Sequence, residues 1–482
     1  MKHAILIGLM SIVLLNTTAQ NEVDALRFSF LQTPGTARSL GMGGAYGALG
    51  ADLSSFWINP GGIGVYRRGG VEGTLGISDM NSITNYEGEE SSNGRANLTV
   101  QSLGMNSTRL LENSPIKSYT VGVAYGKSNN FYERINVRGT ATNTTLLDVF
   151  AAQANGTQSA ELMDVFPFGA GLAWESYVID PLSEDDLTYV AAASGGDVLQ
   201  SKTIERKGAM SETAFGGGIN YMDWLYLGMS VSFHGISFTE NSTYSERFFE
   251  TDNLSSYSFK EDLRVTGTGA GVKFGAVARA TPWLRLGAAW HSRVRYGLTD
   301  TYSASISSAF LDGGNEGYES PVNVSNYILR TPGRWVGSAA FILGEGGVVS
   351  ADYEFSDFSG IRMTGTALNK YDYAVENETI ETIYRSTHRV RAGAELRVAE
   401  SWRARFGAQY FQSPFVKSAN SNSAQTALTA GGGYRYDTFF IDLGITFIQR
   451  TEDYYLYDSR MIEPANSQIT RLSFLLSGGV RF

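Results

Sequence analysis

The chain has 482 residues, a net charge of −10, 55 glycines, 12% aromatic residues and no cysteine. The acidic balance argues against binding to nucleic acid, and against attachment to anionic lipid headgroups by overall charge. The absence of cysteine removes the disulfides that many exported proteins carry. Composition leaves two classes open, a secreted β protein and an outer-membrane β-barrel.

The chain begins with a pattern typical of a secretory signal peptide. Lys2 and His3 give a short basic start, residues 4–15 form an apolar run, and residues 17–19 are small. We therefore expect a signal peptide over residues 1–19, cleaved near Ala19 or Gln20. The apolar run is too short for a membrane anchor, which needs about 20 residues, and no later apolar run is long enough to form a transmembrane helix.

Residues 38–64 form a glycine-rich segment that precedes the first expected strand. Glycine lets a backbone press closely against a wall, and a large barrel has a lumen that side chains alone do not fill. We therefore expect residues 20–70 to form a plug inside a barrel spanning 71–482. Gly41, Gly43 and Gly47 also give a GxGxxxG pattern, but no βαβ unit surrounds it, so we reject a nucleotide site.

Four further residues stand out in this segment. Asn59-Pro60 predicts a sharp, fixed turn that acts as a hinge, because Pro locks φ and Asn caps the turn. Phe56 and Trp57 could contact an acyl tail or wedge the plug in place, and we favour the wedge. The residues assigned to the plug motif are Gly41, Gly43, Gly44, Asn59, Pro60 and Gly61.

After residue 70, apolar and polar residues alternate over long stretches, as in strands that face lipid on one side and water on the other. In 283–299 the alternation places Trp290, Val294, Tyr296 and Leu298 on the lipid face, and Arg285, His291, Arg293 and Arg295 on the lumen face. A soluble β-sandwich also alternates, but its strands average about 5–6 residues, far fewer than here. Trp224, Trp283 and Trp402 mark strand ends, as an aromatic girdle would.

This alternation predicts an all-β transmembrane antiparallel barrel of about 14 strands, an even number, as expected of bacterial barrels. The expected strands are 71–80, 95–109, 117–127, 206–221, 224–239, 260–280, 283–299, 329–343, 346–358, 380–398, 401–411, 426–436, 438–451 and 470–482. Short turns, expected on the periplasmic side, fall at 221–223, 280–282, 344–346, 399–400 and 436–437. Long outer loops are expected at 81–94, 128–205, 240–259, 300–328, 359–379, 412–425 and 452–469. The terminal Phe482 resembles the signal that the barrel-assembly machinery reads.

The 128–205 loop differs from the others. Residues 144–156 and 159–166 predict two short amphipathic helices, and Leu146, Leu147, Val149 and Phe150 form an apolar patch. An exposed apolar patch suggests capture of a hydrophobic ligand. Packing of the patch on the barrel mouth is an equally good explanation.

The segment 38–63, RSLGMGGAYGALGADLSSFWINPGGI, resembles the N-terminal hatch of the FadL/TodX family of long-chain fatty acid and hydrophobic-compound transporters. Asn59-Pro60 fits the family's Asn-Pro-Ala motif, whereas Gly61 departs from its Ala. Segments 331–342, 350–359, 388–398 and 405–415 resemble later strands of that family. The resemblance implies a 14-stranded barrel with an N-terminal plug, a diffusive transport route and a lateral opening in the wall.

Arginines on the expected lumen face are the main chemical clue to a ligand. A guanidinium can hold a carboxylate bidentately, so these arginines could bind a fatty acid headgroup. The alternative is pairing with lumen acids such as Glu395 and Asp442. The candidate ligand-binding residues are Phe56, Trp57, Arg285, Arg293, Arg389, Arg391, Arg403, Arg405, Leu146 and Phe150.

We therefore expect passive uptake of hydrophobic small molecules such as long-chain fatty acids by a monomeric outer-membrane protein, with no cofactor and no metal. The alternative is a plugged barrel that shuttles or anchors secreted proteins at the cell surface. An enzyme is disfavoured because only His234, His291 and His388 follow the signal, on separate strands, with no cysteine. We expect His388 to face lipid or the loops.

Overall fold

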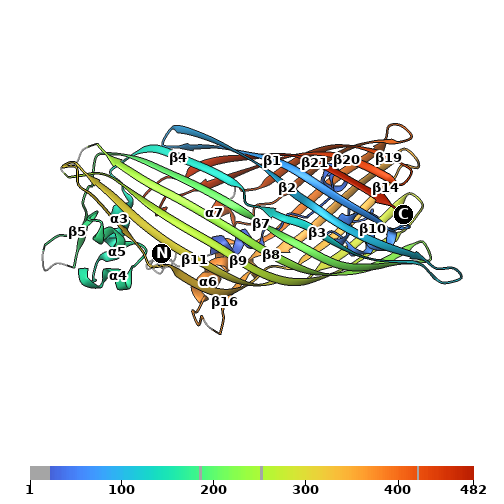
Figure 1. Ribbon diagram of the computed structural model, residues 1–482, viewed down its shortest axis with the longest axis horizontal. Coiled ribbons are helices and arrows are strands. Elements are labelled where there is room, and N and C mark those ends of the chain that lie inside the picture. Colours follow the sequence, from blue (N-terminus) through green and yellow to red (C-terminus); the bar gives the residue numbers. More distant parts are fainter. Residues whose placement is uncertain (1–21, 184–186, 250–252, 368, 421–422) are drawn as a thin grey trace, which may run out of the picture.

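The computed structural model describes residues 22–183, 187–249, 253–367, 369–420 and 423–482. They form one closed barrel of fourteen antiparallel strands, in which the last strand pairs with the first. The helices α3, α4 and α5 lie at one end, here called the helix end, and the C-terminus lies at the other, here called the turn end (Figure 1). The expected signal peptide, 1–19, lies outside the described residues.

Eleven of the fourteen strands are continuous or have one short extension, and three are interrupted. Among the described residues the strands are β1 (Gly70–Tyr86), β2 (Glu89–Leu110), β3 (Ile116–Asn130) extended by β4 (Glu133–Thr142), β7 (Asp197–Tyr221), β8 (Leu225–Phe248), β9 (Leu254–Arg279), β10 (Leu284–His291) with β11 (Arg295–Phe310), β14 (Arg334–Ile342) with β13 (Asn323–Arg330), β15 (Gly347–Asp357) with β16 (Arg362–Gly365), β17 (Ser386–Arg397), β18 (Trp402–Phe411), β19 (Gln425–Tyr436), β20 (Phe439–Tyr454) and β21 (Ala465–Arg481). A short β12 (Asn315–Glu319) pairs with β11, and β5 (Ile179–Pro181) pairs with β6 (Tyr189–Ala191).

The strand count and the five expected short turns are confirmed, but several expected loops are strand. The expected loops at 81–94 and 240–259 are wrong, because β1, β2, β8 and β9 continue through them. The β1–β2 connection is only Glu87-Gly88, both with positive φ, as a tight hairpin requires. Residues 380–383 belong to a helix and not to the expected strand.

Helices are few and short. The plug holds α1 (Glu22–Ser29), α2 (Ala37–Gly41), η1 (Leu53–Phe56) and η2 (Pro60–Val65). The outer loops hold α3 (Leu146–Ala154), η3 (Ser159–Glu161), α4 (Leu162–Val165), α5 (Ala170–Glu175), η4 (Phe358–Gly360), α6 (Ala374–Ile383) and α7 (Lys417–Asn420). Helices are therefore present within the two expected ranges, 144–156 and 159–166, whereas α5 and α6 were not expected.

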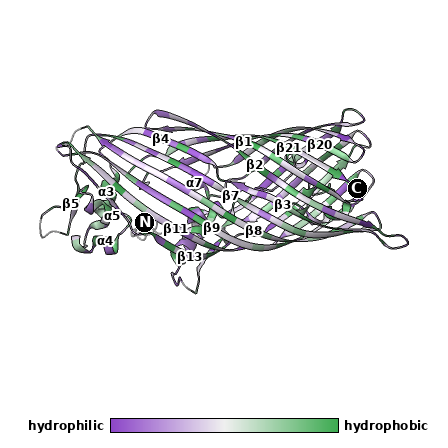
Figure 2. Ribbon diagram, in the orientation of Figure 1, coloured by the Kyte–Doolittle hydropathy of each residue, from purple (hydrophilic) through white to green (hydrophobic). Residues whose placement is uncertain are grey.

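Hydrophobic residues are more frequent in the half of the barrel near the turn end, and hydrophilic residues in the half near the helix end (Figure 2). On β8, Leu227, Met229 and Phe233 are exposed on the outer face, and serines and threonines follow them toward the helix end. No helix within the described ranges is long and apolar enough to cross a membrane. Since about 9–11 tilted residues span a bilayer, the 25 residues of β7 extend well beyond the apolar band.

The wall is irregular where β10 meets β11. Residues 292–294 form a bulge opposite Gly271, and the chain also leaves the ladder at 331–333 and 358–361. A bulge moves the following residues to the opposite face. The lipid-face prediction for Val294, Tyr296 and Leu298 is therefore wrong, because they are buried inside. The lumen-face prediction for Arg293 and Arg295 is wrong as well, because both are exposed outside.

A second irregularity opens the ladder between β2 and β3. These strands pair only from Ser102–Gly126 to Leu110–Ser118. Bulges at Gln101 and Ser128 lie where the pairing stops. Beyond them β4 pairs with β7 but not with β2, and Ser82 of β1 donates to the Arg134 carbonyl. Since Ser82 faces inward, β4 has moved into the lumen and leaves a gap beside β2.

Candidate functional site

The plug, defined as residues 22–69, lies inside the barrel with its backbone pressed against glycines of the wall. A Cβ on Gly407 would overlap the Gly43 amide, and one on Gly228 would overlap the Pro60 carbonyl. On the plug side, a Cβ on Gly61 would lie 2.7 Å from the Ala276 Cα. Such close approach of two backbones requires glycine. The segment's glycine content therefore has a packing explanation, and we call the matching inner wall the seat.

Asn59 connects the plug internally and to the seat. Its Oδ1 accepts from the Gly61 amide at 3.0 Å and caps η2, in which Pro60 is the first residue. Its Nδ2 donates to the carbonyls of Gly47, 2.7 Å away, and Ala276, 3.0 Å away. All three side-chain bonds are made in the buried interior, so Asn59 fixes the turn as expected. A hinge motion at this turn stays a prediction.

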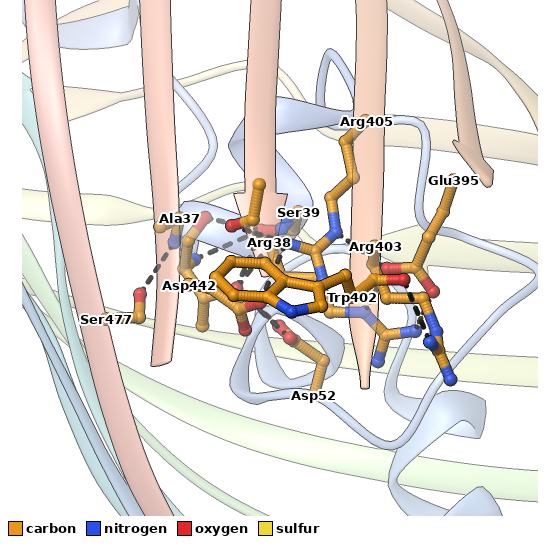
Figure 3. A network of polar contacts seen from close by, with 12 residues as sticks. Ala37, Arg38, Ser39, Asp52, Glu395, Trp402, Arg403, Arg405, Asp442 and Ser477 are labelled. Carbon is orange, nitrogen blue, oxygen red and sulfur yellow. Dashed lines mark hydrogen bonds and ion pairs between the residues drawn. The ribbon is translucent and has the colours of Figure 1, made fainter. Parts of the chain in front are cut away.

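A buried charge network ties α2 to the wall (Figure 3). Arg38 donates twice to Glu395, at 2.9 and 2.8 Å. Arg405, which is fully buried, pairs with the same Glu395 at 2.6 Å and with Asp442 at 2.7 Å. Two cations and two anions neutralise one another, and this is what allows charges to be buried.

A second network, formed by residues of β15 and β17, also holds the plug. Glu354 pairs with Arg391 at 2.6 Å and lies 3.8 Å from Arg389. Arg391 also donates to Thr33, and Arg389 donates to the Leu31 carbonyl. These arginines therefore hold both a wall acid and the plug chain.

Further wall side chains bind plug backbone. Asp352 accepts from the amides of Tyr46 and Gly47 at 3.0 and 2.9 Å. His291 contacts the Ile58 carbonyl at 2.9 Å, and Arg285 donates to the Leu49 carbonyl at 3.2 Å. The seat thus grips the plug along most of its length.

Toward the helix end the lumen is filled by a packed cluster of apolar side chains, which we call the upper chamber. It surrounds α1, whose Phe28 packs edge-on against Phe131 and Phe238 at ring-centroid distances of 6.0 and 5.7 Å. The other buried members include Leu31, Val265, Val294, Tyr296, Leu298, Tyr327, Leu329, Phe358, Ile361, Met363, Tyr373, Ile380, Tyr384 and Phe411. Aromatic and aliphatic walls of this kind suit a hydrophobic ligand.

The plug segment 30–34 lies between this chamber and the gap beside β2. The Gln32 amide donates to the Ser128 carbonyl, and Asn129 donates to the Phe30 carbonyl. Pro34 lies against Gly126, the last residue of β3 to pair with β2. The plug therefore covers the inner side of the gap.

Few side chains bridge the gap itself among the described contacts. Arg95 lies 5.3 Å from the centre of the Tyr132 ring, and Arg138 pairs with Glu89 at 3.8 Å. Asn130 donates to Asn97 at 3.2 Å, and Gln101 reaches the Lys127 carbonyl at 3.5 Å. On the outer face the neighbouring residues of β2 are Leu98 and Val100, both exposed. The gap therefore opens within the apolar band of the wall.

The expected ligand-binding residues lie in several different settings. Phe56 and Trp57 are buried against Gly122 and Gly126 of the wall, which agrees with the wedge interpretation. Arg285, Arg389, Arg391 and Arg405 face the plug or wall acids, and Arg403 donates to carbonyls of its own turn. Arg293 faces outward. Ligand binding by any of them stays a prediction.

The patch on α3 is buried and not exposed, which corrects the expectation for the 128–205 loop. Leu146 and Phe150 are 8% and 6% exposed, and the Phe150 ring lies 5.4 Å from that of Phe259. The apolar residues therefore pack on the barrel mouth, the alternative explanation. Alternating residues in β4 and in the first part of β7 were the signals that this expected loop contains strand.

The histidines do not gather. His234 and His291 are buried on β8 and β10, whereas His388 is exposed on the outer wall, where Tyr353 contacts it at 2.6 Å. Within the described ranges no group of three or more His, Asp or Glu side chains could hold a metal ion.

Arg38, Asp352 and Glu354 also take part in the contacts between plug and wall, although the sequence alone did not single them out. The two acids are two residues apart on β15 and both face inward, so the alternation of the strand could have identified them as lumen residues. Arg38 stands at the start of the glycine-rich segment, where nothing local distinguishes it.

Comparison with known proteins gives a consistent result. The sequence profile of the family described as outer membrane protein transport protein (OMPP1/FadL/TodX) matches residues 30–458. No curated protein sequence matches the chain.

Solved structures of similar fold include a FadL homologue of Pseudomonas aeruginosa, with a TM-score of 0.56, 14% identity, and coverage of 94% of this chain and 100% of that chain. The toluene transporter TodX of Pseudomonas putida gives a TM-score of 0.56, 13% identity and coverage of 94% and 99%. The toluene transporter TbuX of Ralstonia pickettii gives 0.51, 15% identity and coverage of 93% and 99%. At these identities the likeness concerns the fold.

Proposed function

The chain belongs to the OMPP1/FadL/TodX family of outer-membrane transport proteins, and from this premise we propose that it carries hydrophobic small molecules passively across the outer membrane. The family consists of transport proteins and not enzymes. In this setting the helix end faces outside and the turn end faces the periplasm.

The gap between β2 and β4 is the observation that carries the proposal. A molecule in the upper chamber is separated from the lipid beside Leu98 and Val100 by plug segment 30–34 and a few polar side chains. Movement of this short segment would connect the chamber with the membrane. The seat would meanwhile keep the rest of the plug in place and the water path closed.

The upper chamber supports a hydrophobic cargo over a polar one. Phe131 belongs to the chamber and stands at the junction of β3 and β4, directly beside the gap. An apolar molecule therefore meets apolar side chains as far as the exit, and it gains from leaving water without any energy source. Among the solved relatives, a FadL homologue and toluene transporters share this fold. Long-chain fatty acids and monoaromatic hydrocarbons are the two cargo classes to compare.

Uptake into liposomes that contain the purified barrel tests the proposal. We expect labelled oleate or toluene to accumulate faster than in protein-free liposomes, and small sugars to stay excluded. Equal leak of sugars would contradict a plugged transporter. Absence of uptake of both cargo classes, together with binding of secreted proteins to the outer loops, would favour the shuttling or anchoring alternative. Recognition of Phe482 by the assembly machinery and a monomeric state stay predictions.

A further inference from the structure

Four arginines lie together on the outer wall, at the level where three neighbouring strands leave the ladder. Arg295 of β11 is directly opposite Arg330 of β13, and Arg330 is directly opposite Arg362 of β16. Residues that are paired in this way share one face of a sheet. Arg295 and Arg330 are exposed, and Arg293, in the bulge before β11, is exposed beside them. We call these four residues the arginine row.

The arginine row lies at the upper edge of the apolar band. Trp290, Trp335 and Phe355 are consecutive partners across β10, β14 and β15, just on the turn-end side of the row. The Trp335 side chain is 61% exposed, and its ring lies 6.2 Å from that of Trp290. Exposed aromatic rings of this kind mark the membrane–water interface of a barrel. The row is therefore at the height of lipid headgroups.

A pocket of about 460 Å³ connects the row with the aromatic residues. Its lining includes Trp290, Arg293, Arg330, Trp335, Phe355 and Asp357. It thus offers two guanidinium groups above and apolar rings below, an order that matches a headgroup above an acyl chain.

Positive charge exceeds negative charge in this region. Arg362 pairs with Glu381, but Arg293, Arg295 and Arg330 form no ion pair with any carboxylate in the part of the chain that the structure describes. Asp357 shares the pocket, and its Oδ1 accepts from Ser359 and Ser386. Like charges directly opposite one another destabilise a sheet. The row therefore calls for an external anion, despite the net charge of −10 of the whole chain.

We propose that the arginine row and its pocket bind the phosphate headgroup of a lipid in the outer leaflet. A phosphate accepts bidentate hydrogen bonds from guanidinium, and arginine is the side chain best suited to such sites. Basic pockets at the membrane surface recognise phosphorylated headgroups in the same way. The rings of Trp290 and Trp335 contact the upper part of the acyl chains. This site is on the outside of the wall and does not depend on the transport proposal.

Native mass spectrometry of the whole barrel with a lipid A-type phosphoglycolipid tests the site. The test variant is R293Q/R295Q/R330Q, and the matched control is R109Q/R279Q/R397Q, which removes three exposed arginines at the turn end. We expect at least about a tenfold loss of lipid affinity in the test variant, since each cation near an anionic headgroup contributes roughly fivefold. The control should bind as the parent does. R293K/R295K/R330K should retain part of the affinity.

Three further binding measurements distinguish a phosphorylated lipid from other ligands. The dephosphorylated glycolipid should bind the parent as weakly as the phosphorylated lipid binds the test variant. Inorganic phosphate should compete only at concentrations far above the lipid, and equal competition would identify free phosphate as the ligand and overturn the proposal. A fatty acid that binds this site better than the phosphoglycolipid would also overturn it. Equal binding by parent and test variant, with both running as folded barrels on unboiled gels, would do the same.

Discussion

The seat and the upper chamber share one lumen but are built from opposite kinds of residue. The seat presses plug backbone against wall glycines and holds it with buried ion pairs such as Arg405–Glu395. The chamber surrounds α1 with side chains such as Phe131 and Phe238. Directional bonds specify one position, whereas apolar contacts are non-directional and can be exchanged for those of a ligand. The difference indicates which half of the plug stays fixed and which half can move.

The largest expected effect is in the seat. The Glu395 carboxylate pairs with both Arg38 and the fully buried Arg405, and Glu395→Gln removes it from both. Breaking a buried ion pair in this way costs about 3–5 kcal/mol. We expect a much lower midpoint for heat unfolding on gels and a leak of small sugars into liposomes. The control, Glu345→Gln, breaks the exposed pair with Arg397 and should cost about 0–1 kcal/mol. Unchanged exclusion of sugars in Glu395→Gln would mean that the network does not hold the plug.

The next effect concerns the chamber side, where Asp24 lies on α1. Burial raises the pKa of this carboxyl to about 6 from 3.8, although the neighbouring Arg27 opposes the shift. Its contribution to stability is therefore fully present below pH 4 and is lost as the pH rises through 6. A shift of about two units corresponds to about 3 kcal/mol. Once exchange rates in 22–29 are divided by the intrinsic base-catalysed rate at each pH, the protection should be higher at pH 5 than at pH 7.

Asp24→Asn serves as the control for this prediction, because it removes the titrating group and should make the protection in 22–29 equal at the two pH values. Glu240, Arg206 and Glu22 also act on Asp24, so the comparison uses the same buffer strength throughout. Lower protection at pH 5 than at pH 7 in the parent protein would contradict the predicted sign.

A smaller effect is expected from adding a methyl group to the seat. Gly407→Ala places a Cβ on the Gly43 backbone, whereas Gly337→Ala adds the same atom where nothing lies within 4 Å. Overpacking costs about 1–3 kcal/mol. Gly407→Ala should therefore unfold at lower temperature and admit some sugar, and Gly337→Ala should match the parent. Identical behaviour of the two variants would show that the plug does not press on the wall there.

The smallest effect is expected at the turn between η1 and η2, where Asn59 lies. Asn59→Ala removes the cap on Gly61 and the bonds to Gly47 and Ala276, at a cost of about 1 kcal/mol. We expect faster hydrogen exchange in 47–62 without a large change in the heat transition. Asn85→Ala, on an exposed strand position, should leave the exchange unchanged. Protection equal to that of the parent would remove the hinge hypothesis.

The sequence was sufficient for the barrel but not for the site. Alternation over β17 and β18 is regular, so the inward positions of Arg389, Arg391 and Arg405 could be inferred from parity alone. Alternation predicted the wrong face for Arg293, because the bulge at 292–294 leaves no periodic pattern in the sequence. The glycine-rich segment suggested close packing, but it could not show that Gly407 and Gly228 are its partners. The gap beside β2 depends on two bulges in different strands, which only the paired register reveals.

Reversible closure of the gap beside β2 tests the central claim most directly. The chain has no cysteine, so N97C/N130C introduces a single pair across the gap, and L103C/Y125C provides a control within the intact β2–β3 ladder. Oxidation of N97C/N130C should stop uptake of the labelled hydrophobic cargo, and reduction should restore it, with sugars excluded in both states. Uptake that continues unchanged when this pair is oxidised would contradict the proposed exit.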